Sequence, residues 1–534
     1  MNGLLLIISV IIIFIIAYAT YGAWLAKKWG INVSNVSPAK RLQDGVDYVP
    51  TKYYVVLGHH FASIAGAGPI VGPISAAFFG WVPVALWIVI GSIFFGGVHD
   101  FGALFASMRH DGKSIGEIIN KNIGSSGQKL FILFAWLALI LVIAAFNNIV
   151  ASTFATNGAV ATTSMYFIVL AIVFGLLVNR KGVSMSVATI GGVILLFVGI
   201  WFGNAFPIFL STEMWMVILL AYILIAAVTP VWILLQPRDY LNSYLLYAMM
   251  AGGILGLFLY RPSFEIPAFT GFNVNGQFLF PMLFVIVACG AISGFHSLVA
   301  SGTTSKQIEN EKDAQKIGYG SMLIEGVLAT IALISIAFIT ADKAAELGTP
   351  INIFANGVGT FMTTFGINYD IGSSFVALAI SALALTTLDT TARLGRFLFQ
   401  EFFASKNEEQ SSTLLTNKFF ATAVTVVAGG GLGFMGYTTV WPIFGSSNQL
   451  LAALSLLAVA AYLKHLNKSN KMIIIPMIIM FFVTITALGF LIRDNIASGN
   501  FLLVIIAILL LILAVVLIAQ SYKVLSKKES LSEE

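Results

Sequence analysis

The chain has 534 residues, of which 58% are hydrophobic and 10% are charged, against roughly 25% charged residues in a soluble domain. This composition excludes a soluble enzyme, and we expect one integral membrane domain, residues 1–534, embedded in lipid. The net charge of +5 requires no nucleic-acid partner, because the basic residues are sorted by membrane side. The single cysteine, Cys289, can form no internal disulfide.

The first apolar run, 4–25, has no basic residue before it and is followed by Lys27 and Lys28. A secretory signal has the reverse order of charge, so we expect an extra, retained first helix.

Apolar runs of roughly 20 residues, long enough to cross the ~30 Å hydrocarbon core, predict about 15 transmembrane helices. If the helices alternate in direction, one side collects all of the 28 Lys and Arg residues except Arg261, Lys343 and Arg493. That side is cytoplasmic by the positive-inside rule, which places the N-terminus outside and the C-terminus in the cytoplasm. The predicted spans are 4–25, 54–78, 82–108, 129–156, 163–179, 186–204, 213–236, 241–260, 281–304, 318–340, 371–398, 416–436, 441–463, 471–492 and 500–521.

Two connections are predicted to be structured. Residues 113–123 carry isoleucines at helical spacing with lysines opposite, which predicts an amphipathic helix along the cytoplasmic surface. The outer connection 341–370 carries apolar residues among glycines, which favours a folded-in lid. Its apolar positions are Ile351, Ile353, Phe354, Val358 and Phe361.

Two apolar segments, 58–66 and 294–302, share the pattern G-x-H-x5-G and lie on helices of opposite predicted direction. Glycine and proline break helices, and a paired break is typical of the binding site of a secondary transporter. Pro69 is expected to begin an outer half-helix whose free N–H groups bind a carboxylate. The alternative is close packing of helices through small residues. The substrate-binding candidates are His60, Ser63, Gly66, Gly68, Pro69, Ser293, Gly294, His296 and Ser297.

Ionisable residues inside spans form the second set of candidates. An isolated charge at the bilayer centre costs ~2.5–3.5 kcal/mol on insertion scales, so each must be paired, protonated or in contact with water. His99 and Asp100 point about 100° apart on a helix, so we expect no mutual contact and a partner for Asp100 on another helix. Static packing is the alternative role for each single residue.

The eleventh span contains Thr386, Thr387, Asp389 and Thr390, whose oxygens are suited to sodium, while the aspartate alone could carry a proton. In the alternative, the threonines bond their own helix and Asp389 pairs with Arg393. Two polar, proline-marked helix entries, 236–240 and 441–449, are either gates or caps. The ion-coupling candidates are His99, Asp100, Glu325, Thr386, Thr387, Asp389, Thr390 and Arg393.

Several motifs in chain order resemble the carbon starvation protein A (CstA) family. They are the segments 59–69, 97–101, 235–240, 294–296, 389–393 and 441–449. The resemblance implies a bacterial inner-membrane transporter with a five-plus-five inverted-repeat fold. It implies uptake of pyruvate together with protons, or of peptides, during carbon starvation. Repeat one would be 54–204 and repeat two 281–463, with helices 213–260 between them and 471–521 at the C-terminal end. The chain is shorter than the longest family members, so their substrate choice does not carry over automatically.

The sequence thus predicts an all-α polytopic membrane protein, a secondary transporter with broken helices that imports a small carboxylate such as pyruvate, or short peptides, with a proton or sodium ion. A sodium-coupled amino-acid symporter and a transporter-derived nutrient sensor are the alternatives. A membrane enzyme is disfavoured, because six histidines are too few for a di-iron site. We expect no catalytic residue, metal or cofactor, and no residue pattern specifies an oligomeric state.

Overall fold

The structure is a computed structural model that describes residues 2–45, 48–230, 232–403 and 414–526. Within these ranges the regular elements are helices, apart from one hairpin of two short strands, β1 (Asn273–Val274) and β2 (Gln277–Phe278). The chain is therefore an all-α protein, as its hydrophobic periodicity predicts.

In the described part of the chain, 12 helices are long and apolar enough to cross a membrane, or 13 with the bent pair α4–α5 counted as one span. Two shorter apolar helices, α12 (Thr212–Val228) and α20 (Lys418–Gly433), coincide with two further predicted spans. The long helices are α1–α2 (Gly3–Trp29), α6–α7 (Trp81–Arg109), α9 (Ser125–Thr156), α10 (Gly158–Lys181), α11 (Met185–Ala205), α13 (Leu235–Tyr260), α14–α15 (Leu279–Lys306), α16 with the turn before it (Gln315–Ala337), α19 (Tyr369–Phe403), α21 (Tyr437–His465), α22 (Lys471–Ala497) and the apolar part of α23 (Phe501–Gln520).

Each predicted span coincides with an observed helix, and the largest error is at the seventh. That span was expected to run to residue 236, whereas α12 ends at Val228. Pro230 follows two residues later and lacks the N–H that would continue the helix. The segment 236–240 lies instead in the first turns of α13.

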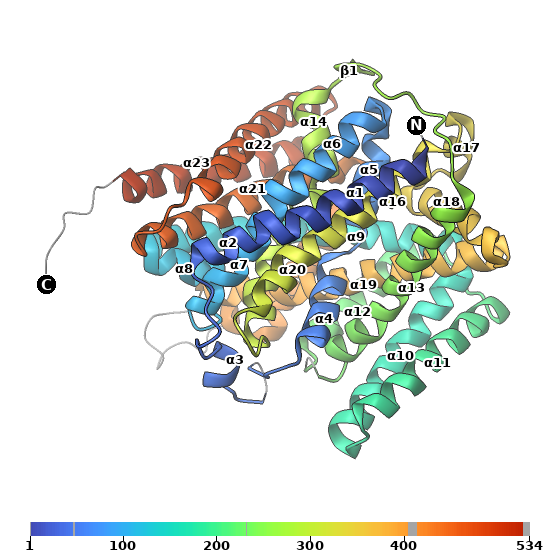
Figure 1. The fold of residues 1–534 in the computed structure, drawn as a ribbon, viewed down its shortest axis with the longest axis horizontal. Helices are drawn as coiled ribbons and strands as arrows, with labels where there is room; N and C mark the ends of the chain where they lie inside the picture. The colour runs from blue at the N-terminus through green and yellow to red at the C-terminus, as the bar shows by residue number, and fades with distance from the viewer. Residues whose placement is uncertain (1, 46–47, 231, 404–413, 527–534) are drawn as a thin grey trace, which may run out of the picture.

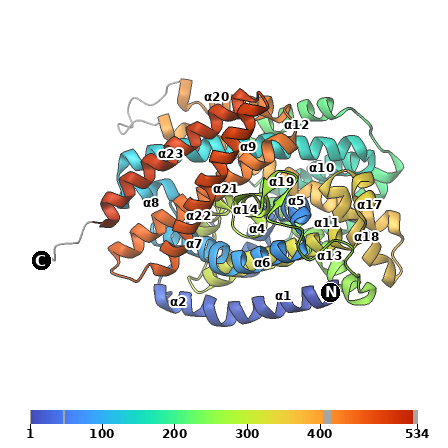
Figure 2. The same cartoon turned by 90° about the horizontal axis from the view of Figure 1, so that it is seen from above.

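The centre of the molecule is formed by α9 together with α19 and α21, both of which pack against α9. The apolar window of α21 is completely buried. The helix pair α1–α2 lies along one face, and α12 and α20 lie at the opposite face (Figure 2). Helices α10 and α11 pair at the edge of the bundle, away from α22 and α23 (Figure 1).

Two helices are broken, as the glycine and proline pattern predicts. Helix α4 (Tyr53–Ile64) is followed by α5 (Gly68–Ala76) after a bend of 45°, and Pro69 lies in the first turn of α5. Helix α14 (Leu279–Val287) is followed by a 3-10 turn, a non-helical stretch and α15 (Gly294–Gly302). The two breaks are adjacent: a Cβ atom on Gly68 would lie 2.6 Å from the Cys289 sulfur.

The shared G-x-H pattern does not mark equivalent positions in the two broken helices. His60 precedes the first break, whereas His296 follows the second. Since α4 packs against α15 and α5 against α14, both histidines lie on packed halves at the same end of the pair. The breaks correspond, but the histidine motif does not repeat with them.

Both structured connections are helical. In α8 (Ile115–Asn122) the isoleucine side is buried against α9 and α21, so this amphipathic helix packs on protein rather than lipid. The connection 341–370 forms α17 (Ala341–Leu347) and α18 (Pro350–Met362). All five of its predicted apolar positions are buried, which confirms a folded-in segment.

Candidate substrate and coupling site

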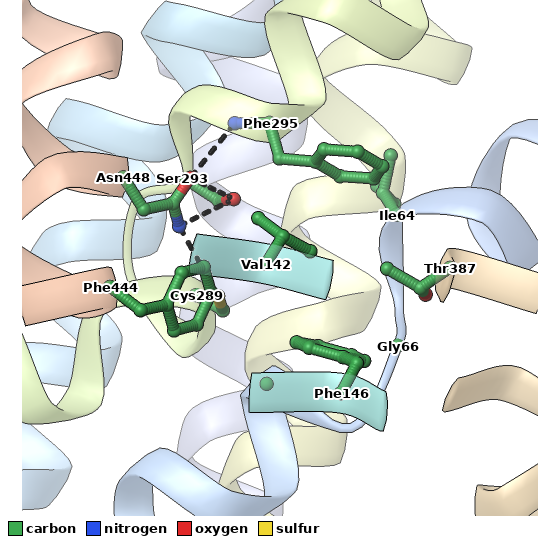
Figure 3. A pocket seen from close by; sticks show the side chains of 11 residues that line it. Ile64, Gly66, Val142, Phe146, Cys289, Ser293, Phe295, Thr387, Phe444 and Asn448 are labelled. Atoms are coloured by element: carbon green, nitrogen blue, oxygen red, sulfur yellow. Dashed lines mark hydrogen bonds between the residues drawn. The ribbon is translucent and has the colours of Figure 1, made fainter. Parts of the chain in front are cut away.

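A cavity with an empty volume of about 280 Å³ lies between the two helix breaks (Figure 3). It is lined from five places in the chain: Ile64, Gly66 and Gly68 at the first break, Val142 and Phe146 on α9, Cys289, Ser293 and Phe295 at the second break, Thr387 on α19, and Phe444 and Asn448 on α21. None of these lining residues carries a charge.

Of the predicted substrate-binding residues, Gly66, Gly68 and Ser293 line the cavity. The other six are neighbours on the same segments that face packed helices: His60, Ser63, Pro69, Gly294, His296 and Ser297. The His60 Nδ1 atom, for example, lies 2.9 Å from the Thr304 hydroxyl, and the Ser297 hydroxyl lies 2.8 Å from that of Ser455. Their rotation about the helix axis is set by neighbouring helices, which motif spacing does not reveal.

Glycine at the first break is required by close approach. A Cβ atom on Gly66 would lie 2.5 Å from the Thr387 hydroxyl oxygen. Because real Cβ atoms do not approach another atom that closely, a side chain at this position would force α4–α5 or Thr387 to shift. Thr387, expected as an ion-coupling residue, lines the cavity.

Asn448 was not predicted individually, although it lies in the singled-out segment 441–449. Its Nδ2 donates to the Ser293 hydroxyl at 3.0 Å and to the Cys289 sulfur at 3.4 Å, and its Oδ1 accepts from the Phe295 N–H at 2.9 Å (Figure 3). Gln449 of the same helix donates to the carbonyl of Phe284 at 2.6 Å. Helix α21 therefore satisfies backbone groups freed by the second break.

A chain of four buried ionisable residues runs beside the cavity. His99 Nδ1 lies 2.7 Å from Asp100 Oδ1, and Asp100 Oδ2 lies 2.8 Å from His296 Nδ1. His296 Nε2 lies 3.4 Å from Glu325 Oε2. We call these residues, from α7, α15 and α16, the histidine–carboxylate chain; each is at most 1% exposed.

The pairing of Asp100 with another helix is confirmed, but the expectation that His99 and Asp100 would not meet is wrong. The carboxylate has two oxygens and lies between the two imidazoles, so one oxygen faces each ring. Although adjacent side chains on a helix point in different directions, a carboxylate has two oxygens, so Asp100 contacts His99 with one and His296 with the other.

Asp389 has a partner that neither alternative for the eleventh span included. The Arg238 guanidinium donates to both carboxylate oxygens of Asp389. Nη2 donates to Oδ1 at 2.7 Å, and Nη1 donates to Oδ2. Tyr222 donates its hydroxyl to Oδ2 at 2.8 Å. The alternative in which Asp389 pairs with Arg393 is wrong, since Asp389 pairs with Arg238, and Arg393 donates to the carbonyls of Ala226 and Thr229 at the end of α12.

The threonines around Asp389 divide in their bonding. Thr386 and Thr387 donate to the carbonyls four residues earlier, at 2.8 and 3.1 Å, which the alternative interpretation predicts. The Thr390 hydroxyl oxygen is buried without a hydrogen-bond partner among the described residues. Arg238 also contacts Asp239 at 3.2 Å, and Asp239 lies 3.9 Å from His59 Nε2.

Comparison with known proteins identifies the family. Residues 2–353 and 342–487 match the family model described as carbon starvation protein CstA. The chain is 32% identical to the peptide transporter CstA of Escherichia coli (88% of this chain, 78% of that protein) and 31% identical to that of Bacillus subtilis (98% and 97%). It is 30% identical to the pyruvate/proton symporter BtsT of Escherichia coli (91% and 81%).

Among solved structures, a manganese transporter of Eremococcus coleocola has a TM-score of 0.51 at 10% identity, covering 90% of this chain and 99% of that one. At this identity the likeness shows a shared fold and nothing about the transported ion. The broken helices, the apolar spans and the sequence match agree: this chain is a multi-pass membrane transporter that belongs to the carbon starvation protein CstA family.

Proposed function

We propose that the chain is a proton-coupled symporter that imports a small carboxylate of the size of pyruvate into a bacterial cell, by alternating access around the cavity between the two breaks. The observation that carries this proposal is the cavity itself, which is formed by both broken helices together with α9, α19 and α21. A site at the crossing of two discontinuous helices is exposed to either side by modest movements of the half-helices.

The cavity favours a small substrate. The lining side chains leave room for little more than water in this conformation, so a substrate enters only when the half-helices move apart, and a small molecule needs the least movement. A carboxylate there has the amino-terminal end of α5, with Pro69 in its first turn, and the polar groups of Ser293, Thr387 and Asn448. Several relatives are named peptide transporters, and a peptide would require the cavity to widen.

The histidine–carboxylate chain is the proposed proton route. Asp100 is in hydrogen-bond contact with both imidazoles, and Glu325 lies 3.4 Å from His296. Imidazole and carboxyl groups this close can exchange protons, and a proton entering this chain changes the charge of α15. Phe295 lines the cavity and His296 follows it on α15. Substrate and proton would therefore act on the same half-helix, which is what coupling requires.

The inverted repeat is also part of the proposal, with one change of boundary. Helix α12 packs against α9 and α19, as α20 does, and α13 packs against α4 as α21 packs against α15. This pattern favours α12 and α13 as the last two helices of repeat one, with α10 and α11 as the insertion. The boundaries expected from the sequence differ, because they include α10 and α11 in repeat one (54–204) and treat α12 and α13 (213–260) as the insertion.

Proteoliposomes containing a pH-sensitive dye test the function. We expect pyruvate added outside to acidify the lumen, without need of sodium, and short peptides not to compete. Lack of pyruvate-dependent proton entry would contradict the proposal, and competition by peptides would shift the substrate class. A fluorescent protein fused to the C-terminus tests the proposed orientation, since it should fluoresce only in the cytoplasm. Unchanged pyruvate uptake in cells lacking the protein, with altered gene expression, would favour the sensor alternative.

A further inference from the structure

The Arg238–Asp389 pair occupies the place for which the sequence pattern offered a sodium ion or a proton as one of two alternatives. The guanidinium of α13 reaches across to α19 and covers both carboxylate oxygens of Asp389. Arg238 and Asp389 are 2% and 0% exposed at the side chain. Water therefore has little access to the pair and cannot solvate either charge in place of its partner.

The side chains that contact this pair carry oxygen atoms, the ligands that hard cations take. Tyr222 of α12 contacts both members, since Arg238 Nη1 lies 2.7 Å from its hydroxyl and the hydroxyl donates to Asp389. Asp239 places a second carboxylate next to Arg238, and the titratable side chain of His59 on α4 lies on the other side of Asp239. Thr390 follows Asp389 on α19 and Asn242 lies four residues after Arg238 on α13; the hydroxyl of the first and the amide oxygen of the second are buried without partners among the described residues.

An ionised carboxylate in this setting requires a cation. Removing one partner of a buried ion pair leaves an uncompensated charge, which is strongly destabilising. Arginine supplies that charge with a planar fork that fits a carboxylate and stays protonated. A free ion would leave and return with each transport cycle, whereas a side chain cannot leave.

We propose that Arg238 is a tethered counter-cation that permanently fills the Asp389 site and so excludes sodium from it. Transport then depends on protons alone, and removal of the guanidinium opens a site for a monovalent cation formed by Asp389, Tyr222 and the neighbouring oxygens. The inference deepens the proposed symport by assigning its ion selectivity to one residue, and it rests on that function only for the transport measurement.

The test compares melting temperatures of the purified full-length protein in choline, sodium and methylguanidinium chloride at equal ionic strength. In R238A, sodium or methylguanidinium should raise the melting temperature by about 2 °C or more, since a ligand that binds only the folded state stabilises it. The wild type should show no difference between salts. The matched controls are R238K, which keeps a tethered charge, and R238A/D389N, which lacks the carboxylate; neither should respond.

Three results would overturn the proposal. One is a sodium-dependent shift in the wild type that D389N abolishes, because Asp389 would then bind sodium beside Arg238. Another is an R238A protein that purifies and responds to neither cation. The third is an R238A protein that folds in neither salt, because the opened site is then not stabilised by cations.

Transport gives a second measurement. Pyruvate uptake by R238A should be at least about fivefold faster in sodium or methylguanidinium than in choline, while wild-type uptake is the same in all three. The melting measurement uses no substrate, so the two proposals fail separately. Absence of wild-type pyruvate uptake would contradict the proposed function and leave the cation result standing.

Discussion

Thr387 of α19 lies against Gly66 at the first helix break, so that a Cβ atom on Gly66 would approach the threonine hydroxyl oxygen to 2.5 Å. The contact joins the broken helix to the long central helix at the wall of the cavity. Any rearrangement of the break must change this contact, which makes it a sensitive point for mutation.

Replacing Gly66 by alanine should reduce pyruvate uptake at least about tenfold without preventing membrane insertion. The added methyl group forces the break away from α19, and overpacking of this kind costs roughly 1–3 kcal/mol. Uptake in vesicles with matched protein amounts measures the effect. Gly489 is the control, since a Cβ atom there would meet nothing within 4 Å; G489A should transport normally. Equal activity of the two variants would show that the helix break at Gly66 is not part of the binding site.

Asn448→Leu should raise the KM for pyruvate about tenfold. The change leaves the Phe295 N–H and the Ser293 hydroxyl without their partner, and an unsatisfied buried group costs roughly 1–3 kcal/mol. Initial rates over a range of pyruvate concentrations measure it. Asn495 on α22 is a matched buried asparagine whose side chain donates only to its own helix, and N495L should keep the wild-type KM. An unchanged KM in N448L would show that α21 does not shape the substrate site.

Cys289 offers a direct measurement of binding, because it is the single cysteine of the chain and lines the cavity. N-ethylmaleimide should inhibit uptake, and saturating pyruvate should slow the modification at least about threefold by occupying the same space. C289A should resist the reagent. Modification at the same rate with and without pyruvate would place the substrate elsewhere.

Glu325→Gln should separate exchange from accumulation. The amide keeps the shape of the side chain next to His296 but cannot take up a proton. Exchange of labelled for unlabelled pyruvate should stay within about twofold of the wild type, because exchange needs no proton release, whereas accumulation driven by a pH gradient should be lost. The exposed Glu346 supplies the control variant, E346Q. Normal accumulation by E325Q would assign the coupling proton to another group.

Asp389→Asn should lower stability rather than merely uncouple transport. It leaves the Arg238 guanidinium buried without a carboxylate, and breaking a buried pair from one side costs roughly 3–5 kcal/mol. The melting temperature of D389N should fall below those of the wild type and of a double variant, R238M/D389L, in which neither charge remains. A D389N protein as stable as the wild type, but unable to accumulate substrate, would restore Asp389 as the coupling group.

The sequence by itself determined the membrane spans and the two breaks. The length of an apolar run and the presence of glycine and proline are local properties, and the solvent, lipid, acts on each span separately. Composition, another local property, also predicted that the connection 341–370 folds in, because it carries apolar residues such as Val358 and Phe361 among glycines, and both are buried.

Tertiary structure decided which side chains meet. Arg238 and Asp389 are 151 residues apart in the chain, and their contact depends on how α13 and α19 rotate and cross. Asn448 entered the site because α21 lies beside the second break, while His60 and Ser63 turned away from the cavity toward neighbouring helices. Hydrophobicity fixes that a helix spans, but in a bundle of apolar helices it carries little information about which face turns inward, so packing and the pairing of a few buried polar groups settle that choice.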